Sequence, residues 1–176
     1  AMGTGTEVEH EVIHGLYNLL PNETLQRAMH ANLERVGGVI YDDEEWNFAE
    51  GIHETFPDAP ALESAAEVQP FHVTDVADVS WMVPTVGMSA ATWIPGTSAH
   101  SWQAIAAGGT PIGNKGMVVA AKTLAATALD LLTDPELVAA AKAEHAERIP
   151  DGWTYESLLG DRDPPLDYRA PAGGGS

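Results

Sequence analysis

The stretch KGMVVAAKTLAATALDLL, residues 115–132, decides how the chain is expected to fold. Its apolar residues recur at helical spacing, and Val118, Ala125 and Leu132 widen the stripe that they form. A helix that is apolar around most of its surface is usually buried. We therefore predict a buried helix whose core-facing stripe is Met117, Ala121, Leu124, Ala128 and Leu131.

Three further helices are predicted around it from start signals. Asp134 followed by Pro135 and Glu136 indicates a helix start, and that helix should run to about Arg148. Asn22 can cap a helix that ends at Gly37-Gly38, with the apolar residues Leu25, Met29, Leu33 and Val36. Asp42 and Glu45 have capping-box spacing before a helix that carries Trp46, Ala49, Ile52 and Phe56.

The remaining patterns predict strands. Residues 6–13 alternate between apolar side chains and the carboxylates of Glu7, Glu9 and Glu11, as in a strand with one solvated face. Residues 71–81 contain short β-like runs, and 85–94 are small and apolar, as in a buried strand. Strands and helices together predict an α/β fold, a mixed sheet flanked by helices.

The composition excludes several classes of function. With 26 acidic and 8 basic residues, the net charge of −18 argues against nucleic-acid binding. The lack of cysteine excludes disulfides and a cysteine nucleophile. No apolar run reaches the length of about 18 residues that a membrane span needs, and no signal peptide is visible, so we expect a cytoplasmic domain without membrane contact. The acidity suggests a salt-rich, halophilic setting.

Of the seven histidines, His100 is the most interesting, since it lies in a Gly/Ser/Thr loop after a predicted buried strand. His10 and His14 are four apart, but on a predicted strand, and no HExxH-type zinc helix is present. Asp75 and Asp78 either orient a ligand or cap a helix. Lys115 either starts a helix or lies near a substrate carboxylate. Trp81, Trp93 and Trp102 either stack on a ligand or pack in the core.

Five stretches taken in order resemble a family. They are TGTEVE (4–9), YNLLPN (17–22), TDVADVSW (74–81), GTSAHSWQ (96–103), and NKGM (114–117) through AAK (120–122). Together they resemble the C-terminal part of the amidohydrolases and metallopeptidases with two metal ions, a superfamily that includes the aminoacylases. The resemblance covers residues 1–147 and is carried best by the blocks around Asp78 and His100.

The resemblance implies a domain division. Residues 1–16 would end an inserted lid or dimerisation domain, 17–148 would complete the catalytic α/β domain, and 149–176 form a tail that we expect to be poorly ordered. It also implies that His100 is a ligand of Zn or Mn in a site with two ions. Asp75 and Asp78 would support the active site without binding metal, and Lys115 would lie near the substrate.

The resemblance further implies hydrolysis of amide bonds in N-acyl or aryl-amide amino acids such as p-aminobenzoyl-glutamate. Metal ions would polarise the amide carbonyl, and a glutamate would move the proton. No block that matches the other metal ligands or this glutamate is found in the 176 residues, so we expect the chain alone to be inactive and its missing half to come from an upstream part or a partner subunit, in an oligomer. The alternative is a non-catalytic acidic binding or assembly domain derived from such a hydrolase.

Overall fold

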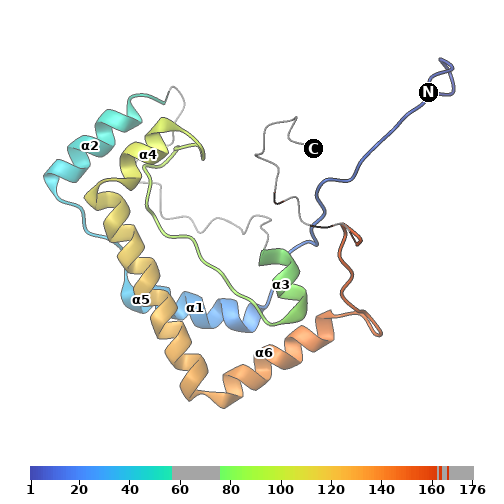
Figure 1. Cartoon of the computed structure of the whole chain (residues 1–176). Coiled ribbons are helices and arrows are strands. Elements are labelled where there is room, and N and C mark those ends of the chain that lie inside the picture. The colour runs from blue at the N-terminus through green and yellow to red at the C-terminus, as the bar shows by residue number, and fades with distance from the viewer. Residues whose placement is uncertain (57–75, 162, 164–165, 167–176) are drawn as a thin grey trace.

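The computed structural model describes residues 1–56, 76–161, 163 and 166, and these residues form helices joined by extended segments (Figure 1). Long α5 crosses α1 and meets α6 at a sharp angle, while α2 and α4 lie together at one end of the molecule and α3 lies beside α1 and α6 (Figure 1). The helices are α1 (Glu23–Val36), α2 (Asp43–His53), α3 (Val76–Met82), α4 (Trp102–Gly108), α5 (Pro111–Thr133) and α6 (Pro135–Arg148).

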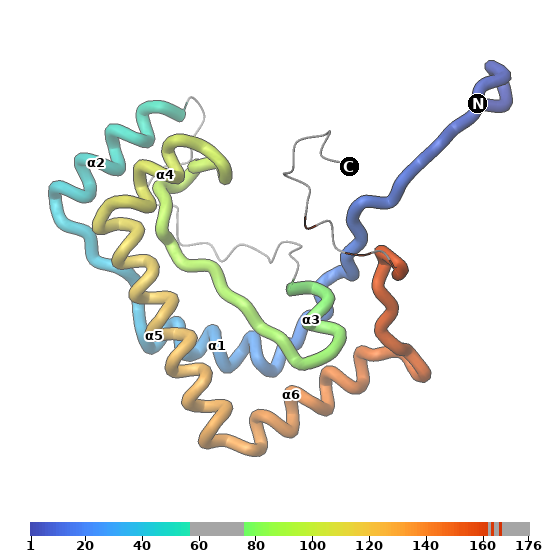
Figure 2. Tube along the Cα trace, in the orientation of Figure 1, coloured from blue at the N-terminus to red at the C-terminus, as the bar shows by residue number. Residues whose placement is uncertain are grey.

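The predicted α/β fold is wrong, because the described residues contain no strand. Residues 6–20 form an extended arm that leads away from the helices, and 85–94 run extended along α5 (Figure 2). A strand needs a partner for its backbone groups, and the described part of the chain places none beside either segment. Residues 76–82 of the predicted β-like run form α3 instead, whereas 71–75 lie outside the described residues.

The predicted helix starts are confirmed. The side chain of Asn22 accepts a hydrogen bond from the backbone N–H of Leu25. Asp42 and Glu45 form a reciprocal capping box at the start of α2, and Asp134 caps α6 with Pro135 in the first turn. Because these signals act within three residues, the sequence alone was sufficient to predict them.

A small apolar core holds α2, α4 and the start of α5 together. Its buried residues are Ala49, Ile52, Ile94, Ala107 and Ile112. Gly116 lets the 85–94 segment approach α5 closely, since a Cβ there would lie on the carbonyl oxygen of Ala91. This contact fixes the extended segment that leads to Ile94 and then to the loop of His100.

The predicted burial of α5 is wrong in its direction. The residues of α5 that are buried are Ile112, Gly113, Gly116, Thr123 and Thr127, a side with small and polar residues. The opposite side is exposed and carries the apolar stripe. We call this side the outer face of α5; it consists of Met117, Val118, Ala121, Leu124, Ala125, Ala128, Leu129 and Leu132.

Polar contacts explain why α5 turns this side inward. Asn32 of α1 is fully buried, and its amide donates hydrogen bonds to the Thr127 hydroxyl at 3.1 Å and to the Asp130 carboxylate at 2.7 Å. Arg35 donates to the Asn32 carbonyl oxygen and lies 3.6 Å from Asp130. Because a buried amide must be hydrogen-bonded, α1 requires the threonine side of α5.

The whole chain exposes 13011 Å² of surface, and many large apolar side chains contribute to it. A compact protein of 18.6 kDa exposes about 8,200 Å² by the usual scaling with mass. By length and composition, α5 also resembles a membrane-crossing helix, although core helices share these properties. The helices therefore leave apolar surface uncovered.

Candidate functional site

His100 lies in the turn between the core residue Ile94 and α4, and its side chain is exposed. It is the one non-glycine residue in the described part of the chain with a positive φ, 61°. Side chains rarely adopt this left-handed conformation, although histidine does so more readily than most. Such strain persists when the surroundings enforce it, and it concentrates at functional sites.

The surroundings of His100 do enforce it. The hydroxyl of Ser101 donates to the carbonyl of Ser98 at 2.7 Å and accepts from the N–H of Ala104 at 3.2 Å, which ties the turn to the start of α4. The N–H of Thr97 donates to the carbonyl of Ile94, and its buried hydroxyl has no hydrogen-bond partner. These bonds present the imidazole to solvent at a defined place.

The described residues do not complete a metal site around His100. Nowhere in residues 1–56 and 76–161 do three histidine, aspartate or glutamate side chains come close enough to hold an ion together. His100 thus offers one imidazole nitrogen, whereas metal sites in enzymes have three or more protein ligands. Any further ligands must come from residues outside the described part.

Asp78 lies on α3 within an aromatic cluster, which we define as Tyr17, Trp81, Trp153 and Tyr155. One oxygen of Asp78 accepts from the Tyr155 hydroxyl at 3.2 Å, while the other is buried without a partner. Desolvation, together with this hydrogen bond, raises the pKa of Tyr155. The cluster joins the N-terminal arm, α3 and the segment after α6.

Asp75, its predicted companion, lies outside the described residues. Of the three tryptophans that we considered for stacking, Trp81 belongs to the aromatic cluster, and its indole N–H donates to the carbonyl of Asn18 at 2.7 Å. Trp93 and Trp102 are exposed.

Lys115 connects α5 to α2. Its ammonium group lies 2.6 Å from the buried carboxylate of Glu45 and 3.0 Å from the carbonyl oxygen of Ile40. It also lies 5.8 Å from the centre of the Tyr41 ring. Burial and the charge of Glu45 raise the pKa of Tyr41, which Lys115 partly offsets.

The sequence indicated Glu45 as a capping residue, but not as the partner of Lys115. The two residues are 70 positions apart, so no local spacing links them. Beside this pair lies an open pocket of about 370 Å³. Its lining consists of Val39, Ile40, Pro111, Asn114, Lys115, Val118, Val119 and Lys122.

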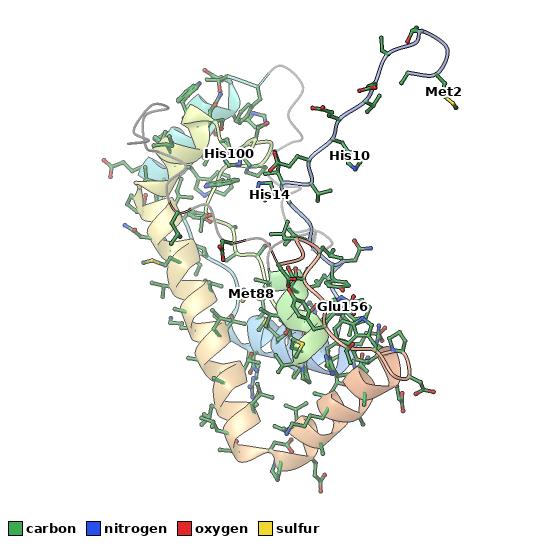
Figure 3. All side chains as sticks on the ribbon, turned by 45° about the vertical axis from the view of Figure 1, so that its right-hand side comes forward. Met2, His10, His14, Met88, His100 and Glu156 are labelled. Carbon is green, nitrogen blue, oxygen red and sulfur yellow. The ribbon has the colours of Figure 1, made fainter. Side chains whose placement is uncertain are left out.

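The predicted site residues do not form one cluster. His100 lies at the end of the molecule that α2 and α4 form, whereas Glu156, next to the aromatic cluster, lies near α3 (Figure 3). Asp78 on α3 is thus in a different part of the fold from His100 (Figure 1). Lys115 lies near the start of α5, on the side of α2.

Comparison with known proteins defines the class. The chain is related to the amidohydrolases and corresponds to the C-terminal part of such a protein, as its motifs indicated. The relative is one of the subunits of p-aminobenzoyl-glutamate hydrolase from Escherichia coli (strain K12), and it is 31% identical over 187 aligned residues. The alignment covers 88% of this chain and 39% of the relative, so the chain spans about two fifths of that protein's length. No protein-family description and no solved structure matches.

Proposed function

We propose that the chain supplies the C-terminal part of a metal-dependent amidohydrolase that cleaves N-acyl or aryl-amide amino acids such as p-aminobenzoyl-glutamate. The similarity to a hydrolase of that name supports the substrate class. The observation that carries the proposal is the geometry of His100. The residue that the family motif marks as a metal ligand is exposed and is held in a strained conformation that a glycine would adopt more readily.

In this proposal, His100 binds Zn or Mn through its imidazole. The ions supply Lewis-acid polarisation of the amide carbonyl when they are bound. The described residues do not bring the remaining ligands together, so these belong to the rest of the enzyme. The isolated chain should therefore show negligible hydrolysis.

Lys115 is proposed to bind a substrate carboxylate. An ammonium group has three N–H donors, and the Glu45 carboxylate and the Ile40 carbonyl use two of them. The third is available at the pocket that Lys115 shares with Lys122 and Asn114. Because Glu45 compensates the charge of Lys115, Lys122 would supply the net positive charge there.

Asp75 and Asp78 are proposed as supporting residues. Asp78 holds Tyr155 and lies away from His100, so its substitution should act through the packing of α3. We expect a smaller effect on activity from Asp78→Asn than from any change at His100.

The test uses the complemented enzyme. The 176-residue chain is coexpressed with the segment of the E. coli relative that the alignment leaves uncovered, and hydrolysis of p-aminobenzoyl-glutamate is assayed with Zn or Mn. His100→Ala should lower turnover by at least about 100-fold, as loss of an essential group does, and should also lower bound metal. His30→Ala, on the exposed side of α1, is the matched control.

Two further results bear on the proposal. His100→Gly should lose metal but not folding stability, because glycine relieves a left-handed strain of about 1–2 kcal/mol. Unchanged metal content and turnover in His100→Ala would refute the proposal. An assembly that forms but hydrolyses nothing with either metal would favour the non-catalytic assembly domain.

A further inference from the structure

The outer face of α5 is a continuous apolar surface without a partner among the described residues. Leu124 is 49% exposed, Met117 and Leu129 are each 59% exposed, and Leu132 is 84% exposed. Small residues such as Ala121 and Ala128 lie between them, so that another element can approach the helix closely. From residue 117 to 132 the face is about 22 Å long at the rise of an α-helix.

The face has no charged residue, although the chain carries a net charge of −18. The charges of α5 lie to the side, at Lys115, Lys122 and Asp130, and Asp130 is used by Asn32. Exposed apolar patches of this size on a protein mark interaction surfaces. Because α1 holds the threonine side through hydrogen bonds, α5 cannot bury its apolar side by rotating without breaking them.

We propose that the outer face of α5 is the docking surface for the N-terminal part of an amidohydrolase of this family. This inference rests on the proposed function and identifies the surface that assembles it. The length of the relative supports this occupant, since about three fifths of it lies outside the region that this chain matches. The excess of exposed surface indicates that a large partner is required.

Two other occupants are less consistent with the structure. A second copy would bring another net charge of −18 to the interface, and this repulsion opposes association at low salt. A membrane would have to accept Lys122 and Asp130 within the span of α5, together with the Asn32 hydrogen bonds, and charged groups there are costly.

The experiment measures binding between the 176-residue chain and the separately purified uncovered segment of the E. coli relative, without metal, by calorimetry. Leu124→Glu and Leu129→Glu should each weaken binding at least about 30-fold, as expected for a buried apolar anchor. Ile105→Glu is the matched control, since Ile105 on α4 is 79% exposed and lies outside the face; its affinity should stay within about threefold. Circular dichroism should show equal helix content in all variants.

Each other outcome overturns the proposal. It fails if the wild-type chain does not bind the segment, or if the face variants bind as well as Ile105→Glu does. It also fails if sedimentation shows a self-dimer that Leu124→Glu breaks while no mixed complex forms. Binding to phosphatidylcholine–phosphatidylglycerol vesicles that Leu124→Glu abolishes, again without a mixed complex, would assign the face to a membrane.

The assay separates this inference from the proposed function. His100→Ala should bind the segment with wild-type affinity, because His100 is on the turn before α4 and not on the outer face. If the parts assemble through the face but hydrolysis is absent, only the proposed function fails. If hydrolysis is present and the face variants retain it, only the docking surface is wrong.

Discussion

Glu144 is a carboxylate of α6 that closes the first turn of α1. Its two oxygens accept hydrogen bonds from the N–H of Glu23 at 2.7 Å and the N–H of Thr24 at 2.9 Å, and Arg148 lies 3.0 Å away. The hydrogen bond from the Thr24 side chain, followed by the two backbone N–H groups and Arg148, lowers the pKa of Glu144 from 4.5 to about 2, although desolvation opposes this. The charged form therefore stabilises the α1–α6 contact.

We predict a change in acid stability from Glu144→Gln. A pKa that is lower in the folded state adds stability that is complete above about pH 4.5 and is lost as the pH falls towards 2. The variant should melt at a lower temperature at pH 7, and its stability should fall less between pH 4.5 and 2 than that of the wild type. Thermal scans across this range measure it.

Glu147→Gln is the control for that prediction. Glu147 is exposed on the same helix and makes no hydrogen bond or ion pair in the part of the chain that the structure describes. Equal behaviour of the two variants would show that general charge, and not the contact with α1, sets the acid stability.

At the level of residues, the sequence predicts what acts locally. Asn22 was recognised as a cap because its partner, Leu25, lies three residues away. Its second bond, from the side-chain amide to the carbonyl of Ala141, spans 119 positions and could not be predicted. The same is true of Lys115 and Glu45. His100 was found through a family motif, and its strain became visible only in the structure.

Gly116 is the element-scale contact on which the path from α3 to α4 depends. A Cβ at this position would lie on the carbonyl oxygen of Ala91 and 2.8 Å from the methyl group of Thr92. Backbone cannot move as easily as a flexible side chain, so Gly116→Ala should destabilise the chain by about 1–3 kcal/mol, the usual cost of overpacking. Chemical denaturation measures the change.

Gly51 provides the matched control on α2. An added Cβ there meets nothing within 4 Å, so Gly51→Ala should stabilise its helix by about 0.5–1 kcal/mol through backbone entropy. If Gly116→Ala were also stabilising, the close packing of residues 91 and 92 against α5 would be disproved.

The helices show how far periodicity carries at this scale. The pattern of residues 115–132 correctly predicted a helix with an apolar stripe, but the stripe faces solvent. Periodicity places residues on one side of a helix; it does not say which element will cover that side. The segments at 6–13 and 85–94 have strand-like patterns for the same reason, yet the described residues give them no partner for backbone pairing.

On the scale of the whole molecule, charge and exposed apolar surface oppose each other. The net charge of −18 keeps copies apart, while the outer face of α5 and other exposed apolar residues favour association. Self-repulsion also acts within one chain, where the acidic residues outnumber the basic ones by more than three to one. Salt should therefore have a large effect on stability.

We predict that the melting temperature rises from low salt to 1 M KCl, because the screening length falls from about 10 Å at 0.1 M to about 3 Å at 1 M. Salt also strengthens apolar contacts, so a charge variant must separate the two effects. Asp43→Asn with Glu44→Gln removes two exposed negative charges from the start of α2 and leaves the Asp42–Glu45 capping box intact. If repulsion dominates, this variant should gain less from KCl than the wild type does. An equal gain would assign the effect to apolar surface, and no rise in either protein would refute the halophilic interpretation of the acidity.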